Sequence, residues 1–269
     1  MRVAAVIIAY HPDRELLTSN ISAIYRHVEK VIVWQNSDDD LSYCRMFPNV
    51  VFGGSGANEF IARPLNETLR TLHSEGYDYI LTMDQDSVFE DFGGFLSAAD
   101  KDNGENVAIY APNAGNLGLD GQVAPVDVES VITSGCLVNI DTAMKLNGFR
   151  EDYGIYWVDS EFCYWARLNG YRIRVLPNHV LRQRFGEKTD TIFGFKCSNY
   201  SATVYFYIVR NMLWLRREFR EAVSMKCILY TLGTNLRGII LGEKQKFRKL
   251  LFIFKAINRG LFSRIQTRK

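Results

Sequence analysis

Residues 78–88, DYILTMDQDSV, decide the fold class, because an apolar run ends here in two carboxylates, Asp84 and Asp86, one residue apart. Residues 78–84 predict a buried strand. A buried carboxylate is costly unless it is paired or holds a cation. We therefore expect both aspartates at the end of that strand, where the chain leaves the core.

The rest of the N-terminal half repeats the pattern of short apolar runs. Residues 3–9, 31–36 and 49–52 predict three further strands, and residues 15–28 and 60–76 predict helices, the second beginning near Arg63 because Pro64 fits only a first helical turn. This alternation predicts a parallel, doubly wound α/β sheet. Ligands of such sheets bind at the carboxyl ends of the strands, so Tyr10, Gln35–Asn36 and Asp84–Asp86 are expected along one edge.

The C-terminal half has a different pattern. Residues 128–140 predict β-structure, 141–148 a short helix capped by Asp141 and ended by Gly148, 159–170 a helix ended by Gly170, and 171–177 a strand. A polar stretch near 186–200 precedes helical patterns at about 201–219 and 222–241.

Two interpretations of Asp84 and Asp86 are open. In a ligand crevice, two hard oxygen ligands suit Mg²⁺ or Mn²⁺, which takes the rest of its coordination shell from phosphates and water. Alternatively, D-Q-D-S is a polar turn in which an aspartate caps the following segment. The spacing alone is a weak signal, and the position after a buried strand favours the cation.

A second acidic pair, Asp159 and Glu161, precedes an amphipathic helix in YWVDSEFCYWARLNG, residues 156–170. The pair fits N-terminal capping and the helix dipole. It also fits a general base, because activation of a hydroxyl needs a carboxylate within hydrogen-bond reach that is partly shielded from water.

Several motifs occur in order over about residues 3–215. They are a first strand ending in A-Y, an N-x-x-x-x-R-x-x-N segment (Asn58, Arg63, Asn66), L-x-M-D-Q-D-S, S-G-C, G-F-R-E-D, V-D-S-E-F-C and a late V-R-N at 209–211. Together they resemble the family 2 glycosyltransferases of GT-A fold, in particular the bacterial rhamnosyltransferase-like members. The resemblance implies a Rossmann-like, mostly parallel sheet flanked by helices, with a C-terminal helical extension. It implies a catalytic domain over residues 1–200, with a nucleotide-sugar half near 1–100 and an acceptor half near 101–200, and a helical extension over 201–269.

The resemblance also implies roles for individual residues. Ala9, Tyr10, Gln35 and Asn36 would border the nucleotide base, Arg63 would approach the diphosphate, Asp86 would be the principal metal ligand, and Asp84 would face the ribose or the metal. Asp159 would be the base, with Glu161 as its neighbour or substitute, and Ser134, Gly135, Cys136 and Trp157 would lie at the acceptor. The implied cofactor is Mg²⁺ or Mn²⁺, and the implied donor is a sugar of dTDP or UDP type.

Three positions depart from the family pattern. Gln35 and Asn36 stand where relatives often carry an aspartate that reads the base, and Phe60 stands where they often carry glycine. Gln183, in RQRFGE, stands where a metal-proximal histidine is common, and His179 lies four residues earlier. The Gln183 departure leaves metal dependence open.

The implied reaction is an inverting transfer of a sugar, with rhamnose as one candidate, to a hydroxyl of a saccharide or lipid-linked acceptor in bacterial surface polysaccharide synthesis. An inactive nucleotide-sugar-binding protein of the same fold is the alternative, favoured by Phe60 and Gln183. A nucleotidyltransferase would be expected to carry a Gly-rich loop after the first strand, where this chain has AYHPDRE.

The tail has a charge pattern of its own. The last 27 residues carry nine Lys or Arg against one acid, with apolar residues at helical spacing: Phe247, Leu250, Leu251, Phe254, Ile257 and Leu261. This predicts a basic amphipathic helix suited to an anionic membrane surface. A packed helix with a solvated basic face is the alternative. A nucleic-acid partner is disfavoured because the aromatic residues fall on the apolar face.

The amino-acid composition indicates in which cellular compartment the protein works. The 269 residues are 47% hydrophobic with a net charge of +2, typical of a globular protein. Five scattered cysteines without C-x-x-C spacing argue against a disulfide framework and a zinc site and fit a reducing compartment. The N-terminus does not resemble a signal peptide, and no apolar run reaches the roughly 18 to 20 residues of a membrane span. We expect a cytoplasmic protein that is soluble or peripheral on the inner face of the membrane.

Overall fold

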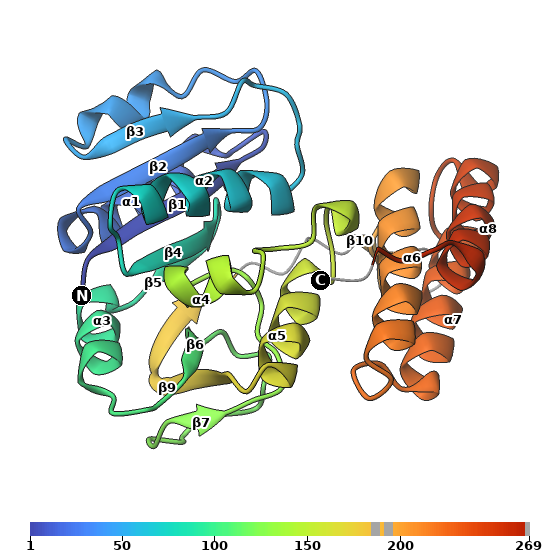
Figure 1. The fold of residues 1–269 in the computed structure, drawn as a ribbon. Helices are drawn as coiled ribbons and strands as arrows, with labels where there is room; N and C mark the ends of the chain where they lie inside the picture. Colours follow the sequence, from blue (N-terminus) through green and yellow to red (C-terminus); the bar gives the residue numbers. More distant parts are fainter. Residues whose placement is uncertain (184–188, 191–195, 267–269) are drawn as a thin grey trace. The chain divides into compact units, whose positions relative to one another are not determined.

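The computed structural model describes residues 1–183, 189–190 and 196–266. The chain divides into two compact units (Figure 1). The first unit is Met1–Glu151 with Phe162–Arg184, and the second is Asp152–Glu161 with Phe185–Lys269. Each unit builds a hydrophobic core of its own. The predicted domains, residues 1–200 and 201–269, stay a prediction.

The first unit is built on a mixed sheet with the order β3-β2-β1-β4-β8-β6-β9-β5. The strands are β1 (Val3–Ala9), β2 (Lys30–Gln35), β3 (Val50–Gly53), β4 (Tyr79–Asp84), β5 (Val88–Phe89), β6 (Val107–Asn113), β7 (Val126–Asp127), β8 (Cys136–Asn139) and β9 (Arg172–Arg182). The first four strands pair in parallel, as do β6 and β9. β8 runs antiparallel between β4 and β6, and β5 and β7 pair antiparallel with β9. The predicted α/β class and mostly parallel sheet are confirmed.

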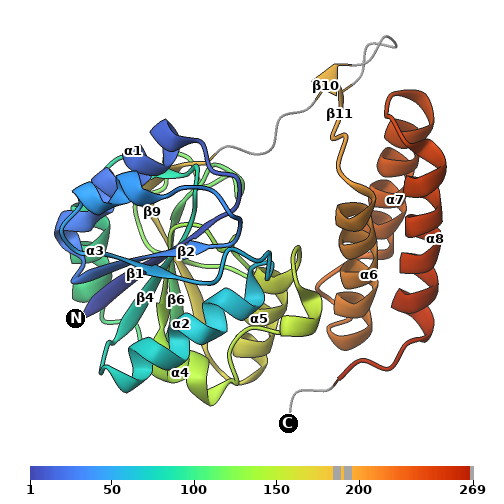
Figure 2. The same cartoon turned by 90° about the horizontal axis from the view of Figure 1, so that it is seen from above.

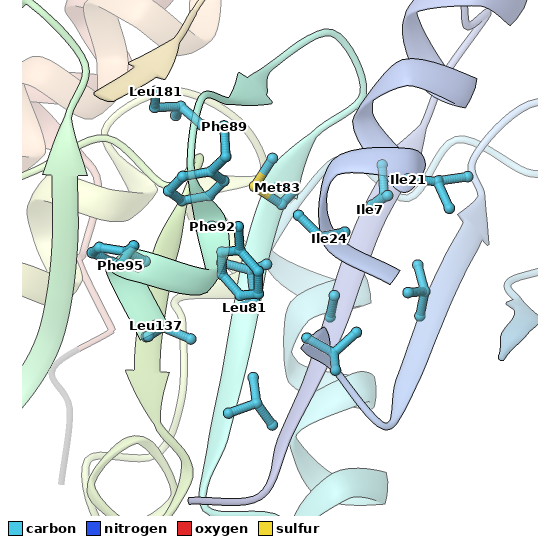
Figure 3. Close-up of a cluster of buried hydrophobic side chains, with 14 of the residues drawn as sticks. Ile7, Ile21, Ile24, Leu81, Met83, Phe89, Phe92, Phe95, Leu137 and Leu181 are labelled. Carbon is cyan, nitrogen blue, oxygen red and sulfur yellow. The ribbon is translucent and has the colours of Figure 1, made fainter. Parts of the chain in front are cut away.

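Helices cover both faces of this sheet (Figures 1 and 2). α1 (Arg14–Ile24) and α3 (Phe92–Lys101) lie on one face, and α2 (Ala62–Ser74) and α4 (Ile140–Lys145) lie on the other. On the α1 side, Ile21 and Ile24 of α1 and the rings of α3 pack over Ile7 and Leu81 of the sheet (Figure 3). Burial of this apolar surface drives the strands and helices together.

The structure corrects two local expectations. α4 is capped by Asn139, whose side chain accepts from the Thr142 amide at 2.8 Å, and not by Asp141. The start of the helix is fixed here because the Ile140 amide donates to Asp78 O at the sheet. Residues 128–135 form no strand, so the β-structure predicted over 128–140 is confined to β8.

The other predicted elements agree with the structure within a few residues. The helix predicted over 15–28 is α1 followed by a 3-10 turn, Tyr25–His27, and α2 places Pro64 in its first turn. The helix predicted over 159–170 is α5 (Val158–Leu168), with Gly170 following at positive φ. The polar stretch predicted near 186–200 lies partly outside the described residues; β10 (Thr189–Asp190) and β11 (Lys196–Cys197) fall within it.

Three helices form most of the second unit: α6 (Ala202–Glu218), α7 (Met225–Leu241) and α8 (Lys246–Phe262). Ser201 and Ser224 cap α6 and α7, since each side chain accepts an amide of the first turn. Their core gathers Tyr205, Val209 and Met212 of α6 with Ile253 and Ala256 of α8. The predicted late helices are confirmed. Within the described part of the chain, no helix has both the length and the apolar character that a membrane crossing needs.

The five cysteines are free thiols. Cys44, Cys136, Cys163 and Cys197 are buried, and Cys227 is half-buried. None of them is paired in a disulfide, so packing and hydrogen bonds hold both units together.

Candidate active site

The carboxyl ends of β1, β2 and β4 meet at one edge of the sheet. Ala9 pairs with Gln35, and Ile8 pairs with Asp84. The side-chain amide of Gln85 then grips the backbone of Tyr10: Tyr10 N donates to Oε1 at 2.7 Å, and Nε2 donates to Tyr10 O at 3.1 Å. The Tyr10 ring, 46% exposed, therefore stands beside the D-Q-D-S turn on a fixed backbone.

A chain of hydrogen bonds, here called the Asp84 ring, fixes the first aspartate of that turn. Asp84 N donates to Ser134 Oγ at 3.0 Å, Ser134 Oγ donates to Ser87 Oγ at 2.9 Å, and Ser87 Oγ donates to Gln183 Oε1. Gln183 Nε2 closes the ring by donating to Asp84 Oδ2 at 2.9 Å. Asn20 Nδ2 also donates to Asp84 O at 2.5 Å. Both serines are buried, so the bond between them is shielded from water, whereas the bond from Gln183 to Asp84 Oδ2 lies at the surface.

The ring defines what Gln183 does. A carboxylate only accepts hydrogen bonds, so the amide nitrogen of Gln183 must face Asp84 and its oxygen must face Ser87. In this orientation Gln183 holds the Asp84 carboxylate in place. Its oxygen is turned toward a protein hydroxyl. Gln183, which stands where the family resemblance implies a metal-proximal histidine, thus supports a neighbouring carboxylate.

The S-G-C motif lies beneath the same edge. Ser134 and Cys136 are each 1% exposed, and Gly135 has φ +81°. A Cβ on Gly135 would come within 2.8 Å of side-chain atoms of both Leu181 and Pro112. The motif thus supports Asp84 from inside the fold, and direct contact of these residues with an acceptor stays a prediction.

Asn36 holds a loop. Its Nδ2 donates to Phe60 O at 2.9 Å, its Oδ1 accepts from Glu59 N at 2.8 Å, and the residue is 3% exposed. Phe60 lies in this loop at φ +60°, the left-handed region that favours glycine. Glycine, which the resemblance leads us to expect at this position, would adopt this φ without strain. Contact of Asn36 with a base stays a prediction.

A cleft of about 420 Å³ lies beyond the ends of β1 and β2. Pro12, Arg14 and residues 39–43 line it. The Arg14 guanidinium lies 4.9 Å from the centre of the Tyr43 ring, and burial raises the pKa of Tyr43 to about 12. Sequence reasoning missed Arg14 and the carboxylates of this cleft, although the run of aspartates after the second strand was a signal.

The N-x-x-x-x-R-x-x-N segment separates into a surface residue and a buried one. Arg63 is exposed and pairs with Glu67 at 2.9 Å and Glu59 at 3.4 Å, the contacts of a helix-surface charge. Asn66 is buried and exchanges two hydrogen bonds of 2.7 Å with the backbone of Phe149. The contact joins this segment to G-F-R-E-D, residues 148–152. A role of Arg63 at a diphosphate stays a prediction.

In the second unit, the V-R-N motif holds the segment that leads to Asp159. The Asn211 amide donates to the carbonyl oxygens of Tyr153, Ile155 and Tyr156 at 2.8 to 2.9 Å and is fully buried. Arg210 donates to Asp152 O at 2.5 Å. Burial lowers the pKa of Arg210 to about 10, which leaves it protonated at neutral pH.

This segment carries backbone strain next to the acidic pair. Tyr156 and Trp157 have φ +63° and +64°, which costs of order 1–3 kcal/mol for each non-glycine residue. The Trp157 indole donates to Ile208 O at 3.1 Å, which helps to hold the strained turn. Asp159 follows in the first turn of α5 and is half-buried, whereas Glu161 is 1% exposed. Of the two carboxylates, Asp159 is the more accessible.

Comparisons with known proteins agree with this description. No family model matches the chain. Over 240 residues, 80% of each chain, it is 26% identical to a dTDP-rhamnosyl transferase, RfbF, of Shigella flexneri. Its structure is similar to that of the mannosyltransferase PcManGT of Pyrobaculum calidifontis, solved with GDP-Man and Mn²⁺, with a TM-score of 0.59 at 13% identity over 98% of this chain and 76% of the other. It is also similar to GalNAc-T7 solved with UDP, GalNAc and Mn²⁺, with a TM-score of 0.58 at 7% identity over 96% of this chain and 57% of the other.

The chain has the GT-A fold. The curated relative and the shared fold confirm the resemblance to rhamnosyltransferase-like glycosyltransferases.

Within this GT-A fold, the strand edge offers the chemistry that a hard divalent cation needs. Among residues 1–183, 189–190 and 196–266, no group of three or more His, Cys, Asp or Glu side chains is arranged to hold a metal. Mg²⁺ or Mn²⁺ bound with a diphosphate needs only one or two protein carboxylates. Asp84 and Asp86, at and just after the exposed end of β4, would offer such oxygen ligands, so the residues fit the ion.

Proposed function

We propose that the chain transfers a sugar, with rhamnose as the first candidate, from a dTDP- or UDP-sugar to a hydroxyl of a saccharide or lipid-linked acceptor. The transfer inverts the configuration at the anomeric carbon. It is a step in the synthesis of bacterial surface polysaccharide. The similarity to RfbF supports the donor class. The observation that carries the proposal is the Asp84 ring, which fixes a carboxylate at the edge where sheets of this kind bind ligands.

The donor site is assigned to the ends of β1, β2 and β4. The exposed Tyr10 ring borders the base together with Ala9 and Gln35, and Asn36 contributes by holding the loop at Phe60. The cleft beside these strand ends carries Arg14 together with Asp39 and Asp40, so a phosphate group there would need Arg14 or a bound cation to offset the two carboxylates. Arg63 is proposed as a second cation that binds the diphosphate.

Asp86 and Asp84 are assigned to Mg²⁺ or Mn²⁺, which supplies positive charge to the diphosphate when it is bound. Gln183 does not bind the ion itself in this proposal; it orients Asp84 through a hydrogen bond. Two of the similar structures contain Mn²⁺, which supports a divalent ion at this site.

Asp159 is assigned as the general base. It accepts the proton of the acceptor hydroxyl while that oxygen bonds to the anomeric carbon and the bond from this carbon to the diphosphate breaks. Its accessibility supports this choice over the buried Glu161. The residues proposed to lie at the acceptor site are Trp157, Ser134, Gly135 and Cys136.

A thermal shift of the purified protein against dTDP, UDP, GDP and CDP, with and without Mn²⁺, tests the donor site. A ligand that binds only the folded state raises the melting temperature. We expect one nucleotide to shift it in the presence of metal, and Asp86→Ala to abolish the shift. Absence of a shift with every nucleotide would overturn the proposal.

Turnover separates an enzyme from the inactive binding protein. A selective shift combined with release of nucleoside diphosphate from the matching sugar donor supports catalysis. The same shift without release, across saccharide and lipid-linked acceptors, would favour the binding protein.

A further inference from the structure

The outward face of α8 carries a stripe of exposed apolar side chains. Phe247, Leu251, Phe254 and Leu261 are 91, 51, 68 and 47% exposed. Their spacings of four, three and seven residues place them on one side of a helix. The opposite side, formed by Lys249, Ile253, Ala256 and Gly260, is buried. α8 thus has two apolar faces, of which one packs in the core and the other, here called the outer stripe, lies on the surface.

Basic residues line one edge of the outer stripe. Arg248, Lys255 and Arg259 are separated by seven and four residues, so they share a side of the helix next to the stripe and are exposed. The combination of apolar and cationic stripes is typical of helices that lie in a membrane interface.

The surrounding charge has one sign. From Met225 to Lys269 the sequence contains eleven Lys or Arg and a single acid, Glu243. The Glu243 side chain is fully buried and bonds Lys249 Nζ at 2.7 Å. The surface of residues 225–266, the part of this segment that the structure describes, therefore presents basic side chains without acidic ones, since Glu243 is internal and paired with Lys249.

α7 repeats the pattern. Met225, Leu229 and Ile240 are 53, 64 and 51% exposed and lie on one side of the helix. Lys226 and Arg237 are exposed beside them. Two helices of the second unit thus combine exposed apolar side chains with positive charge.

We infer that the outer stripe of α8 docks the protein onto an anionic phospholipid bilayer, with the apolar side chains entering the acyl boundary and the basic edge contacting headgroups. A second copy of the chain is a poor occupant, because it would bring two cationic surfaces together. Phospholipids of negative charge complement both the apolar and the basic stripe. The inference goes beyond the proposed function and does not depend on it.

Co-sedimentation of the full chain with vesicles tests the docking. The vesicles are phosphatidylcholine alone, or phosphatidylcholine mixed with phosphatidylglycerol. We expect binding to the anionic vesicles that weakens with added salt. The double variant Phe247→Ser/Phe254→Ser should lose binding at least about tenfold, and Arg248→Gln/Lys255→Gln/Arg259→Gln should lose the preference for phosphatidylglycerol. Met46→Ser/Val123→Ser, which removes two apolar side chains of similar exposure from the first unit, should bind like the wild type.

Each contrary outcome has a distinct meaning. Unchanged vesicle binding by both α8 variants, with native circular dichroism spectra, would overturn the inference. Failure of the wild-type protein to bind anionic vesicles would also overturn it. Sedimentation velocity that detects a dimer lost in Phe247→Ser/Phe254→Ser would assign the stripe to a second copy instead. Tighter binding to duplex DNA or RNA than to vesicles would assign it to nucleic acid. The nucleotide thermal shift of the variants should equal that of the wild type, so failure of docking is distinct from failure of the donor site.

Discussion

Amide side chains, three of them buried, recur at the motif positions, and each holds a backbone segment or a carboxylate in place. Asn36, Asn66 and Asn211 bind loops, and Gln183 binds Asp84. A buried amide that loses its partners costs about 1–3 kcal/mol, so such residues are sensitive to substitution even when they touch no ligand. Two of them give direct tests at the residue scale.

Gln183→Ala is expected to weaken nucleotide binding about tenfold, equivalent to about 1.4 kcal/mol, because Asp84 loses the donor that orients it. Isothermal titration with the nucleotide that gives the thermal shift measures the change. Gln122→Ala, at an exposed loop position, is the matched control. An unchanged dissociation constant would show that the other bonds of the Asp84 ring suffice.

Asn211→Ala is expected to destabilise the protein by about 2–3 kcal/mol, because the carbonyl oxygens of Tyr153, Ile155 and Tyr156 lose the hydrogen bonds of a fully buried amide. If Asp159 is the base, kcat should fall while the dissociation constant of the nucleotide stays constant. Urea unfolding and steady-state kinetics measure the two effects. Asn169→Ala, which removes an exposed amide bonded to a single carbonyl, should change neither.

At the element scale, Gly135 joins the loop from residue 128 to β8. Gly135→Ala is expected to cost about 3 kcal/mol, since an added Cβ meets Leu181 and Pro112 and the positive φ penalises it. Gly121→Ala is the matched control: φ is +80° there, but the Cβ meets nothing within 4 Å. The difference between the two variants in urea unfolding isolates the steric part. Equal losses would contradict the packing described for this glycine.

Asp102 connects the end of α3 with β6 and β9, because its carboxylate accepts from Arg174 at 2.7 Å and from the Tyr110 hydroxyl at 3.0 Å. Burial raises the pKa of this carboxyl, but the hydrogen bonds from Arg174, Tyr110 and the Gly104 amide, together with the positive charge of Arg174, outweigh it and the net pKa is lowered. A lowered folded pKa stabilises the protein above the unfolded value, about 3.9, and this stability is lost as the pH falls through the folded pKa.

Asp102→Asn is therefore expected to lose about 2 kcal/mol at pH 7 and to lose less stability than the wild type on further acidification below about pH 4. Urea unfolding at both pH values measures the difference. Asp38→Asn, at an exposed position, is the control. A parallel loss in the wild type and in Asp102→Asn would contradict the linkage.

The sequence predicts the elements that have a clear period and misses those that depend on distant partners. Strands β1 to β4 and helices α1, α2 and α6 follow from apolar runs and spacing. β5 and β7 have two residues each and exist because β9 pairs with them, which local pattern does not reveal. For the site, the motifs identify Asp84, Ser134 and Gln183 as special, but the closed ring of hydrogen bonds appears only when β4 and β9 are placed in space.

At the scale of the whole molecule, two hydrophobic cores serve two units. The second core is locked by a buried network in which Tyr205 and Lys249 both bond Glu243, at 2.6 and 2.7 Å. Because this ion pair is buried, the stability of the second unit depends on both partners: removing one leaves the other as an uncompensated buried charge, which is costly.

Lys249→Met is expected to destabilise the second unit by about 3–5 kcal/mol, since it leaves Glu243 buried without its cation. Hydrogen exchange followed by mass spectrometry should show faster exchange in α6 to α8 and little change in β1 to β4, because local stability follows the local core. Lys226→Met, at an exposed position of α7, is the control. Equal acceleration in both units would indicate a single cooperative structure.

The distribution of the free thiols has a practical consequence. Cys44, Cys136 and Cys163 are sealed inside the first unit, and Cys197 is sealed inside the second. A buried thiol reacts with an alkylating reagent only when its surroundings open. The alkylation rate of each buried thiol in the native chain therefore reports how often its surroundings open. Timed alkylation followed by peptide mapping measures this opening rate for each unit without any introduced label.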